Sequence, residues 1–182
     1  DEDGSQTAGD PLEIALLEAG RSAGLSRQDL LRAMPQVRER PFETATKMMA
    51  TFHRLNGGLR VAVKGAPEAV LASCTRIRTR DGSEADFGAD LRRRWLDHNT
   101  EMAESGYRLL ALASKQAHRS KDNPYTDLIF LGLLGLYDPP RVTVKDAIGR
   151  CRAAGIRVVM VTGDHLQTAR SIARQVGLVE DA

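Results

Sequence analysis

The sequence predicts an α/β protein in which an antiparallel sheet flanked by helices is followed by a partial parallel segment. Three observations lead to this prediction. MMATFHRLNGGLRVAVKG (48–65) has the pattern of two strands joined at Asn56-Gly57, where both residues tolerate positive φ. LIFLGLLGLY (128–137) is almost entirely apolar, which is typical of a strand buried on both faces. IRVVMV (156–161) repeats that composition after a helical segment.

Two helices are expected ahead of the hairpin. Asp10 is a candidate cap for the first, with Pro11 at its first position and Gly20 as its stop. Ser26 is a candidate cap for the second, which Pro35 would end. Apolar residues recur at helical spacing in both segments, so each helix has a face suited to packing on a sheet.

The middle of the chain continues to mix helices and strands. A short helix is expected over residues 67–73, and RIRTRDGSEADF (76–87) has the pattern of a second hairpin. Asp90 is a candidate cap for a longer helix with an apolar stripe, which Gly106 would close, and YRLLALAS (107–114) has the pattern of a strand. These elements would complete the antiparallel sheet and its helices.

A polar loop, HRSKDNPYTD (118–127), marks the predicted domain boundary. The first domain would cover 1–126 and the second 127–182. In the second, the two apolar strands alternate with a helix starting at Thr143 and another over 166–176. That alternation is typical of a parallel α/β layer.

The composition excludes several classes of function. The net charge of +2 on 182 residues gives no reason to expect a nucleic acid partner. Cys74 and Cys151 lie far apart without a CxxC pattern, which fits a reducing compartment, and the four histidines share no metal-binding spacing. The longest apolar run, 128–137, is shorter than the about 20 residues of a membrane helix.

One group of candidate binding residues lies in the first domain. KGAPEAVL (64–71) places a lysine and a glycine at the mouth of a helix, which suits a phosphate chain or simply a turn with a solvated lysine. Phe42 has an aromatic face that can stack on adenine, although a core position is the commoner role for phenylalanine. Lys47 is a further point charge for phosphates or a solvated side chain, and Glu13 is also a candidate capping partner of Asp10.

A second group follows the two apolar strands of the second domain. In TGD, Thr162 can donate its hydroxyl to a phosphate oxygen, Gly163 allows close approach, and Asp164 either positions neighbouring groups or caps a helix. In DPPR, Asp138 and Arg141 either order a phosphate site or hinge, or form a surface pair on a stiff linker. No GxxxxGK[ST] or GxGxxG loop is present, so isolated side chains would have to bind a nucleotide, with a Kd of about 1 mM.

Six motifs occur in the order in which they occur in P-type cation-transporting ATPases. They are GDPLEIALL (9–17), PFETATKMM (41–49), KGAPEAVL (64–71), GYRLLALA (106–113), LGLLGLYDPPR (131–141) and MVTGDHLQTA (160–169). The chain resembles the nucleotide-binding domain of such a pump followed by part of its phosphorylation domain, which has a Rossmann-like, haloacid-dehalogenase-type fold. KGAPE argues against the heavy-metal branch, and GDPLEIALL favours the calcium-like branch.

The resemblance implies roles for the candidate residues of the first domain. Phe42 would stack on the adenine of ATP, and Arg108 would reach its phosphates. The other residues lining the same pocket would be Glu13, Lys47, Lys64 and Gly65, with Gly65 letting the nucleotide approach. Glu43 and Thr44 depart from the serine or aspartate and the arginine that often follow the stacking phenylalanine.

The resemblance also implies roles in the second domain. Thr162, Gly163 and Asp164 would belong to the phosphorylation site. Asp138 and Arg141 would join the two domains and steady the phosphate end of ATP. The segment around 118–127 and DPPR would then be candidate hinges between the domains.

The sequence lacks two motifs on which catalysis in this family depends. The DKTGT motif, whose aspartate is phosphorylated, is absent, and so is the GDGxND motif that holds magnesium. This chain alone is therefore expected to bind ATP without hydrolysing it, with most ligands of Mg²⁺ outside it. In the intact pump it would be a cytoplasmic domain without direct membrane contact. Its partners would be ATP and the remaining phosphorylation, actuator and membrane domains.

Two alternatives stay open at this point. One is a non-catalytic module that senses nucleotide or docks a partner. The other is a haloacid-dehalogenase-like phosphatase, against which the absence of a DxDx[TV] nucleophile motif counts.

Overall fold

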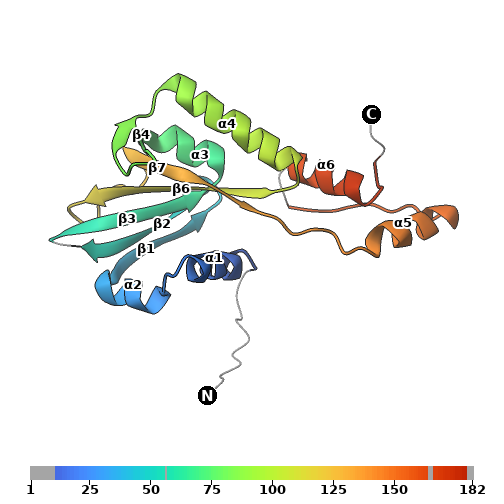
Figure 1. The fold of residues 1–182 in the computed structure, drawn as a ribbon, viewed down its shortest axis with the longest axis horizontal. Coiled ribbons are helices and arrows are strands. Elements are labelled where there is room, and N and C mark those ends of the chain that lie inside the picture. The colour runs from blue at the N-terminus through green and yellow to red at the C-terminus, as the bar shows by residue number, and fades with distance from the viewer. Residues whose placement is uncertain (1–10, 56, 164–165, 180–182) are drawn as a thin grey trace, which may run out of the picture.

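The computed structural model describes residues 11–55, 57–163 and 166–179 (Figure 1). Its strands are β1 (Gln36–Glu43), β2 (Met48–Leu55), β3 (Gly58–Gly65), β4 (Cys74–Arg78), β5 (Glu84–Asp86), β6 (Arg108–Ala117) and β7 (Leu128–Leu136). Its helices are α1 (Pro11–Ser22), α2 (Arg27–Ala33), α3 (Pro67–Ser73), α4 (Ala89–Glu104), α5 (Val144–Ala153) and α6 (Leu166–Gln175).

These strands form one seven-stranded sheet in the order β1-β2-β3-β6-β7-β4-β5. Neighbouring strands are antiparallel, apart from the parallel pair β4 and β7. Helices α1 and α2 lie on one face, and α3 and α4 on the other (Figure 1). The predicted antiparallel sheet flanked by helices is therefore confirmed.

Strand β7 confirms the apolar strand predicted after residue 127, and its neighbours are specific. It pairs in parallel with β4 and in antiparallel with β6, along most of its length. The parallel pairing expected here is thus made with a strand of the predicted first domain. The boundary between residues 126 and 127 stays a prediction.

The core lies between the sheet and the helices α3 and α4. Phe52 and Val61 are directly paired across β2 and β3, and both are fully buried because alternate residues of each strand face these helices. Phe130 of β7 is also fully buried, with ring centroids 5.4 Å from Phe87 and 5.0 Å from Trp95. This aromatic cluster fixes α4 against the sheet.

Both predicted hairpins are present. The β2–β3 register runs from Met48 opposite Gly65 to Leu55 opposite Gly58, and Gly57 has a φ of 80°. Asn56 lies outside the described residues. Glycine in the second hairpin plays the same part, with a φ of 85° at residue 82, between β4 and β5.

The helix boundaries agree with their predicted signals only in part. Ser26 caps α2 as predicted, because its side chain accepts a hydrogen bond from the backbone N–H of Asp29 at 3.3 Å. Helix α1 continues past Gly20 to Ser22, and the predicted cap, residue 10, lies outside the described residues. The N-cap of α4 is Gly88, so the prediction that Asp90 caps this helix was wrong by two residues.

Strand β1 was not predicted. Its sequence, QVRERPFE, is rich in charge and contains Pro41, both of which weaken the strand pattern. The strand is nevertheless formed at the sheet edge, where proline is tolerated and all of its charged side chains except the half-buried Arg38 are exposed. It matters for function because Phe42 is its next-to-last residue.

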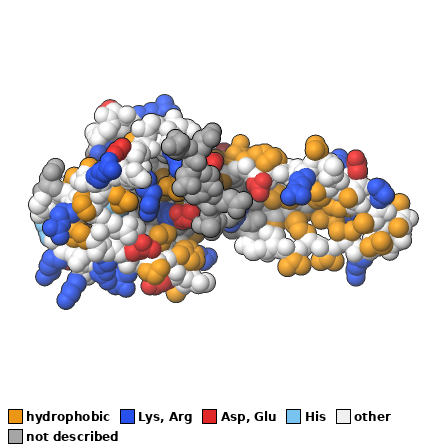
Figure 2. Space-filling model, turned by 90° about the horizontal axis from the view of Figure 1, so that it is seen from below, with side chains coloured by type: hydrophobic (Ala, Val, Ile, Leu, Met, Phe, Trp, Pro, Cys, Tyr) orange, Lys and Arg blue, Asp and Glu red, His pale blue; other side chains and the backbone are white. Residues whose placement is uncertain are grey.

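The strand predicted over residues 156–161 is wrong. This segment contains no regular secondary structure, and Val159 and Val161 are 72% and 92% exposed. A strand needs a neighbour to accept its backbone hydrogen bonds, and no described strand lies beside this segment. Together with α5 and α6 it forms an arm on which hydrophobic side chains gather (Figures 1 and 2).

The arm is attached to the sheet through α6 and β7. Thr168, which is 2% exposed, donates its hydroxyl to the backbone oxygen of Tyr107 at 3.0 Å. Tyr137 donates its hydroxyl to the Gln175 side chain at 3.4 Å. The first contact holds the start of α6 beside the start of β6, and the second holds the end of α6 beside the residue that follows β7.

The two cysteines should differ sharply in reactivity. Cys74 is 1% exposed, and burial raises the pKa of its thiol to about 12, whereas Cys151 is partly exposed. Only the thiolate is nucleophilic, so at about pH 8 we expect iodoacetamide to alkylate Cys151 and spare Cys74 in the folded chain. In urea both should react, which mass spectrometry would measure. Equal labelling of both in the folded chain would contradict the burial of Cys74.

Candidate functional site

Phe42 lies in the open at the end of β1. Its side chain is 61% exposed, which is unusual for a phenylalanine. It lines a hollow of about 320 Å³, named here the Phe42 cleft, that is enclosed by the start of α3, by α4, by the start of β6 and by the segment before α6. Of the two roles open to Phe42, a core position is therefore excluded.

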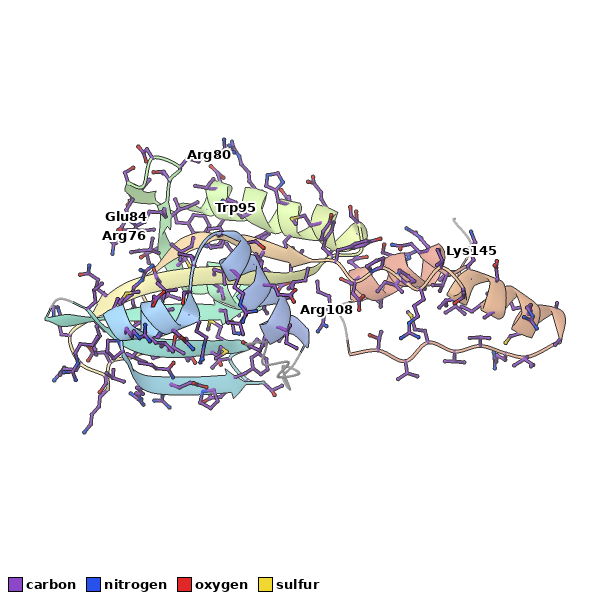
Figure 3. The ribbon with its side chains drawn as sticks, turned by 60° about the horizontal axis from the view of Figure 1, so that its bottom comes forward. Arg76, Arg80, Glu84, Trp95, Arg108 and Lys145 are labelled. Atoms are coloured by element: carbon purple, nitrogen blue, oxygen red, sulfur yellow. The ribbon has the colours of Figure 1, made fainter. Side chains whose placement is uncertain are left out.

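Arg108 enters the Phe42 cleft from the first residue of β6. Figure 3 shows its side chain where the sheet meets the arm. Gly163 lines the same cleft from the segment before α6. The structure thus brings together three predicted residues that are 121 positions apart from first to last.

Several polar lining residues of the Phe42 cleft were not predicted. Asn99 of α4 is 9% exposed, Thr168 of α6 is 2% exposed, and Glu68 of α3 is exposed. Asn99 sits in an amphipathic helix with no motif around it, and Thr168 lies within MVTGDHLQTA (160–169) without a predicted role. Only the packing of α4 and α6 near the end of the sheet brings them to the cleft.

Lys64 faces a second hollow, the Lys64 cleft, of about 510 Å³. This cleft lies between the helices α1 and α2 and the sheet face formed by β2 and β3. Lys64 donates to the carboxylate of Glu13, and the two form an ion pair in which the side chains are 19% and 51% exposed. Glu13 therefore contacts another candidate binding residue, while its alternative partner, residue 10, lies outside the described residues.

Gly65 separates the two clefts. Lys64 before it lines one cleft, and Ala66 after it lines the other. A side chain at residue 65 would place its Cβ 2.4 Å from the backbone oxygen of Lys47, which also accepts a hydrogen bond from the Ala66 N–H at 3.0 Å. Residue 65 must therefore be a glycine because the backbone of the turn before β2 lies against it.

Lys47 forms that turn with a φ of 54°, a backbone conformation that is rare for residues with a side chain. Its backbone N–H donates to the oxygen of Glu43 at 2.7 Å, which closes the turn between β1 and β2. The Lys47 side chain is exposed. It is not among the described residues that line the Phe42 cleft or the Lys64 cleft.

The remaining candidates lie on the arm. Thr162 is exposed, and Asp164 lies outside the described residues. Asp138 and Arg141 are exposed between β7 and α5, and neither lines the Phe42 or the Lys64 cleft. Within the described part of the chain, no group of three or more His, Cys, Asp or Glu residues is placed to hold a metal ion.

The sequence matches a known family over most of the residues that form this site, although not over Gly163 and Thr168. Residues 1–143 match the model described as "P-type ATPase, cytoplasmic domain N". The chain belongs to the P-type ATPase family. The resemblance carried by the six motifs is therefore confirmed.

Individual P-type ATPases match almost the whole chain. Calcium-transporting ATPase 1 of Bacillus cereus is 41% identical over 180 residues, which cover 97% of this chain and 20% of that protein. Cation-transporting ATPase pma1 of Synechocystis is 38% identical over 179 residues, covering 95% and 19%. Sodium/potassium-transporting ATPase subunit alpha-2 of Gallus gallus is 34% identical over 190 residues, covering 96% and 19%.

The chain spans about a fifth of the length of each of these P-type ATPases. In the described part of the chain, every helix is too short or too polar to cross a membrane.

Proposed function

We propose that this part of a P-type ATPase binds ATP and presents it to a phosphorylatable aspartate that the 182 residues do not contain. One observation carries the proposal: an exposed phenylalanine lines a cleft that also holds Arg108 and Gly163. A volume of about 320 Å³ lies at the lower end of the about 300–1,000 Å³ of small-molecule sites.

The chemistry of the Phe42 cleft suits a nucleotide. The ring of Phe42 offers a flat apolar surface to the base, and a guanidinium forms strong charge-assisted hydrogen bonds with phosphate oxygens. The two groups enter from strands that β2 and β3 separate in the sheet. A ligand with an aromatic base and a phosphate chain can therefore engage both.

The other proposed pocket residues surround this cleft. Lys64 is paired with Glu13 in the neighbouring cleft, so we propose that phosphate competes with this carboxylate for the ammonium group. Lys47 would add charge from its exposed turn. Gly65 would contribute through the backbone path it permits between the two clefts.

The arm would carry the phosphorylation side of the site. Gly163 in the Phe42 cleft supports a role for Thr162 and Asp164 close to the phosphates of ATP. Asp138 and Arg141 are proposed to act at the junction of β7 with the arm. Bound Mg²⁺ would neutralise charge on the phosphates, and most of its ligands would lie outside this chain.

In the intact protein, this unit would face the cytoplasm as part of an ATP-driven cation translocase. Its partners would be the remaining phosphorylation, actuator and membrane domains. The exposed valines at residues 159 and 161 support this view, because further strands of the phosphorylation domain would cover them. Alone, the chain is proposed to bind ATP without hydrolysing it.

Arg108→Gln should weaken binding of ATP more than binding of AMP, because AMP lacks the outer phosphates. We expect the Kd for ATP to rise about three- to tenfold and that for AMP less than about twofold. A titration of the ¹⁵N-labelled chain with each nucleotide, followed by NMR, measures both and locates the shifted amides. Arg80→Gln, which removes the same charge on the loop between β4 and β5 (Figure 3), is the control.

Two results would overturn this assignment. An equal loss for ATP and AMP would remove Arg108 from the phosphate side. Shifts confined to residues away from the Phe42 cleft would reject the cleft as the nucleotide site.

A further inference from the structure

A third hollow, named here the basic cleft, lies on the same sheet face as α1 and α2, on the part of that face that the two helices do not cover. It has a volume of about 570 Å³ and is formed by β3, β6, β7, β4 and β5, with a contribution from the end of β2. The residues on which its chemistry depends are Arg60, Arg76, Arg78, Glu84, Ile129 and Leu131. The nucleotide proposal does not use this cleft, and of its lining residues only Leu131 belongs to one of the six motifs.

Positive charge exceeds negative charge in the basic cleft. Arg76 and Arg78 share one carboxylate, that of Glu84, at 2.6 and 2.8 Å. Lys115 does not add to this charge, because it pairs with Val61 and its side chain leaves the other face of the sheet, where it donates to the backbone oxygens of residues 123 and 126. Arg60 forms no ion pair with any described residue. The three cationic side chains of Arg60, Arg76 and Arg78 therefore face one carboxylate.

The sheet register sets the spacing of these cations. Arg60 on β3 pairs with Gln116 on β6, while Arg76 on β4 pairs with Ile129 on β7. Ile129 pairs with Ser114 and Ser114 with Ala62, so Arg76 is level with Ala62, two residues along β3 from Arg60. Three strand steps of about 4.8 Å and this offset of about 6.8 Å put the two arginine backbones about 16 Å apart. Ile129, which is 6% exposed, and Leu131, at 40%, form an apolar floor between them.

This pattern matches an extended acidic peptide better than a compact anion. In an extended chain, side chains on one face recur about every 6.8 Å, so residues i and i+4 are about 14 Å apart. Carboxylates at i and i+4 would reach Arg60 and the arginines of β4, with an apolar side chain at i+2 over Leu131. A single phosphate group is too small to bridge the two sides.

We propose that the basic cleft docks an extended acidic segment of a separate partner protein, with the order acidic–x–apolar–x–acidic. The cleft lies at the end of β3 that holds Arg60, whereas Lys64 and the Phe42 cleft lie at the other end. The arm and the start of α1 lie toward that other end too (Figure 1). The docking surface therefore lies at the end of the sheet far from the arm, and a partner bound there would leave the proposed nucleotide site open.

The test uses the whole 182-residue chain and a fluorescein-labelled peptide made of three repeats of Glu-Ser-Leu-Ser closed by a final Glu. Fluorescence anisotropy at about 50 mM salt should show binding that is lost at about 0.5 M salt, because screening weakens exposed charge pairs. The same peptide with Gln in place of Glu, and a shuffled peptide with adjacent glutamates, should bind at least about tenfold more weakly.

Variants locate the site. Arg60→Gln combined with Arg78→Gln should raise the peptide Kd about tenfold. Arg94→Gln, which removes a charge from exposed α4 on the opposite sheet face, should change it less than about twofold. Circular dichroism confirms folding of each variant, and Arg60→Gln alone tests the site without removing a partner of Glu84. In the labelled wild-type chain, peptide should shift the amides of Ile129 and Leu131.

Three outcomes would overturn the proposal. One is equal weakening by Arg94→Gln and by the double variant, and another is equal binding of the designed and shuffled peptides. The third is Arg60-dependent binding to phosphatidylserine vesicles with no binding of the peptide, which would assign the cleft to a lipid surface. None of these outcomes bears on ATP binding, which uses the other end of the sheet.

Discussion

Replacing Phe42 with alanine is expected to weaken ATP binding by about 1–3 kcal/mol, a rise in Kd of roughly five- to 150-fold. The reason is that a stacked base loses its apolar partner while nothing else in the cleft offers an aromatic surface at that position. Tyr107 also lines the cleft, but it packs against Tyr137 with ring centroids 5.3 Å apart. NMR titration with ATP and AMP measures the change, and both nucleotides should lose affinity because both contain adenine.

The high exposure of Phe42 makes this variant easy to interpret. A side chain that is 61% exposed contributes little to the core, so the thermal midpoint of Phe42→Ala should stay close to that of the wild type. Val37→Ala removes another partly exposed apolar side chain from the same strand without touching the cleft. Unchanged ATP affinity in Phe42→Ala, or an equal loss in Val37→Ala, would reject the stacking role. Phe42→Trp should retain binding.

Local signals in the sequence predicted those elements whose geometry depends on a few adjacent residues. The β2–β3 hairpin is one, because a glycine with positive φ at residue 57 lets two strands pair directly. The cap of α2 is another, because Ser26 and Asp29 form it alone. Strand β1 was missed since an edge position, which tolerates Pro41 and charge, is a property of the assembled sheet.

The strand wrongly predicted over residues 156–161 also shows that strand formation depends on neighbours in the assembled sheet. Its apolar, β-branched residues have the composition of a buried strand. A strand, however, exists only with a neighbour, and the described chain provides none there. The composition of this segment predicts the conformation that it favours, whereas the presence or absence of a neighbouring strand decides whether it forms a strand.

The candidate site divides in a similar way. From the residues alone, Phe42 was more consistent with a core position, and the family resemblance pointed to adenine instead. Its exposure now excludes the core. Asn99 carried no signal and Thr168, although within the motif 160–169, had no predicted role, because helices distant in the sequence bring the two residues to the cleft. The ion pair of Glu13 with Lys64 was likewise beyond sequence reasoning, since 51 residues separate the two.

Gly65 is both a tightly packed residue of the sheet and a residue of the proposed ATP site. Among the variants proposed here, its replacement should have the largest effect on stability. A Cβ there would lie 2.4 Å from the Lys47 oxygen, 2.8 Å from the Met48 side chain and 2.9 Å from the Met48 Cα. Two of these neighbours are backbone atoms, so the turn before β2 would have to move away from β3. We expect Gly65→Ala to destabilise the chain by about 1–3 kcal/mol, which lowers the thermal midpoint by several degrees.

Gly58→Ala is the matched control, because it adds the same methyl group to the first residue of the same strand. There the new Cβ would lie 3.6 Å from the Ala117 oxygen and 3.8 Å from the Leu55 oxygen, which are ordinary contacts. Its thermal midpoint should stay within about 2 °C of the wild type. Since movement of the turn would also displace Lys47 and the hydrogen bond from Ala66, Gly65→Ala should weaken ATP binding together with stability. Weakened ATP binding at unchanged stability would instead favour direct approach of the nucleotide to Gly65, and would reject the packing role derived from this close contact.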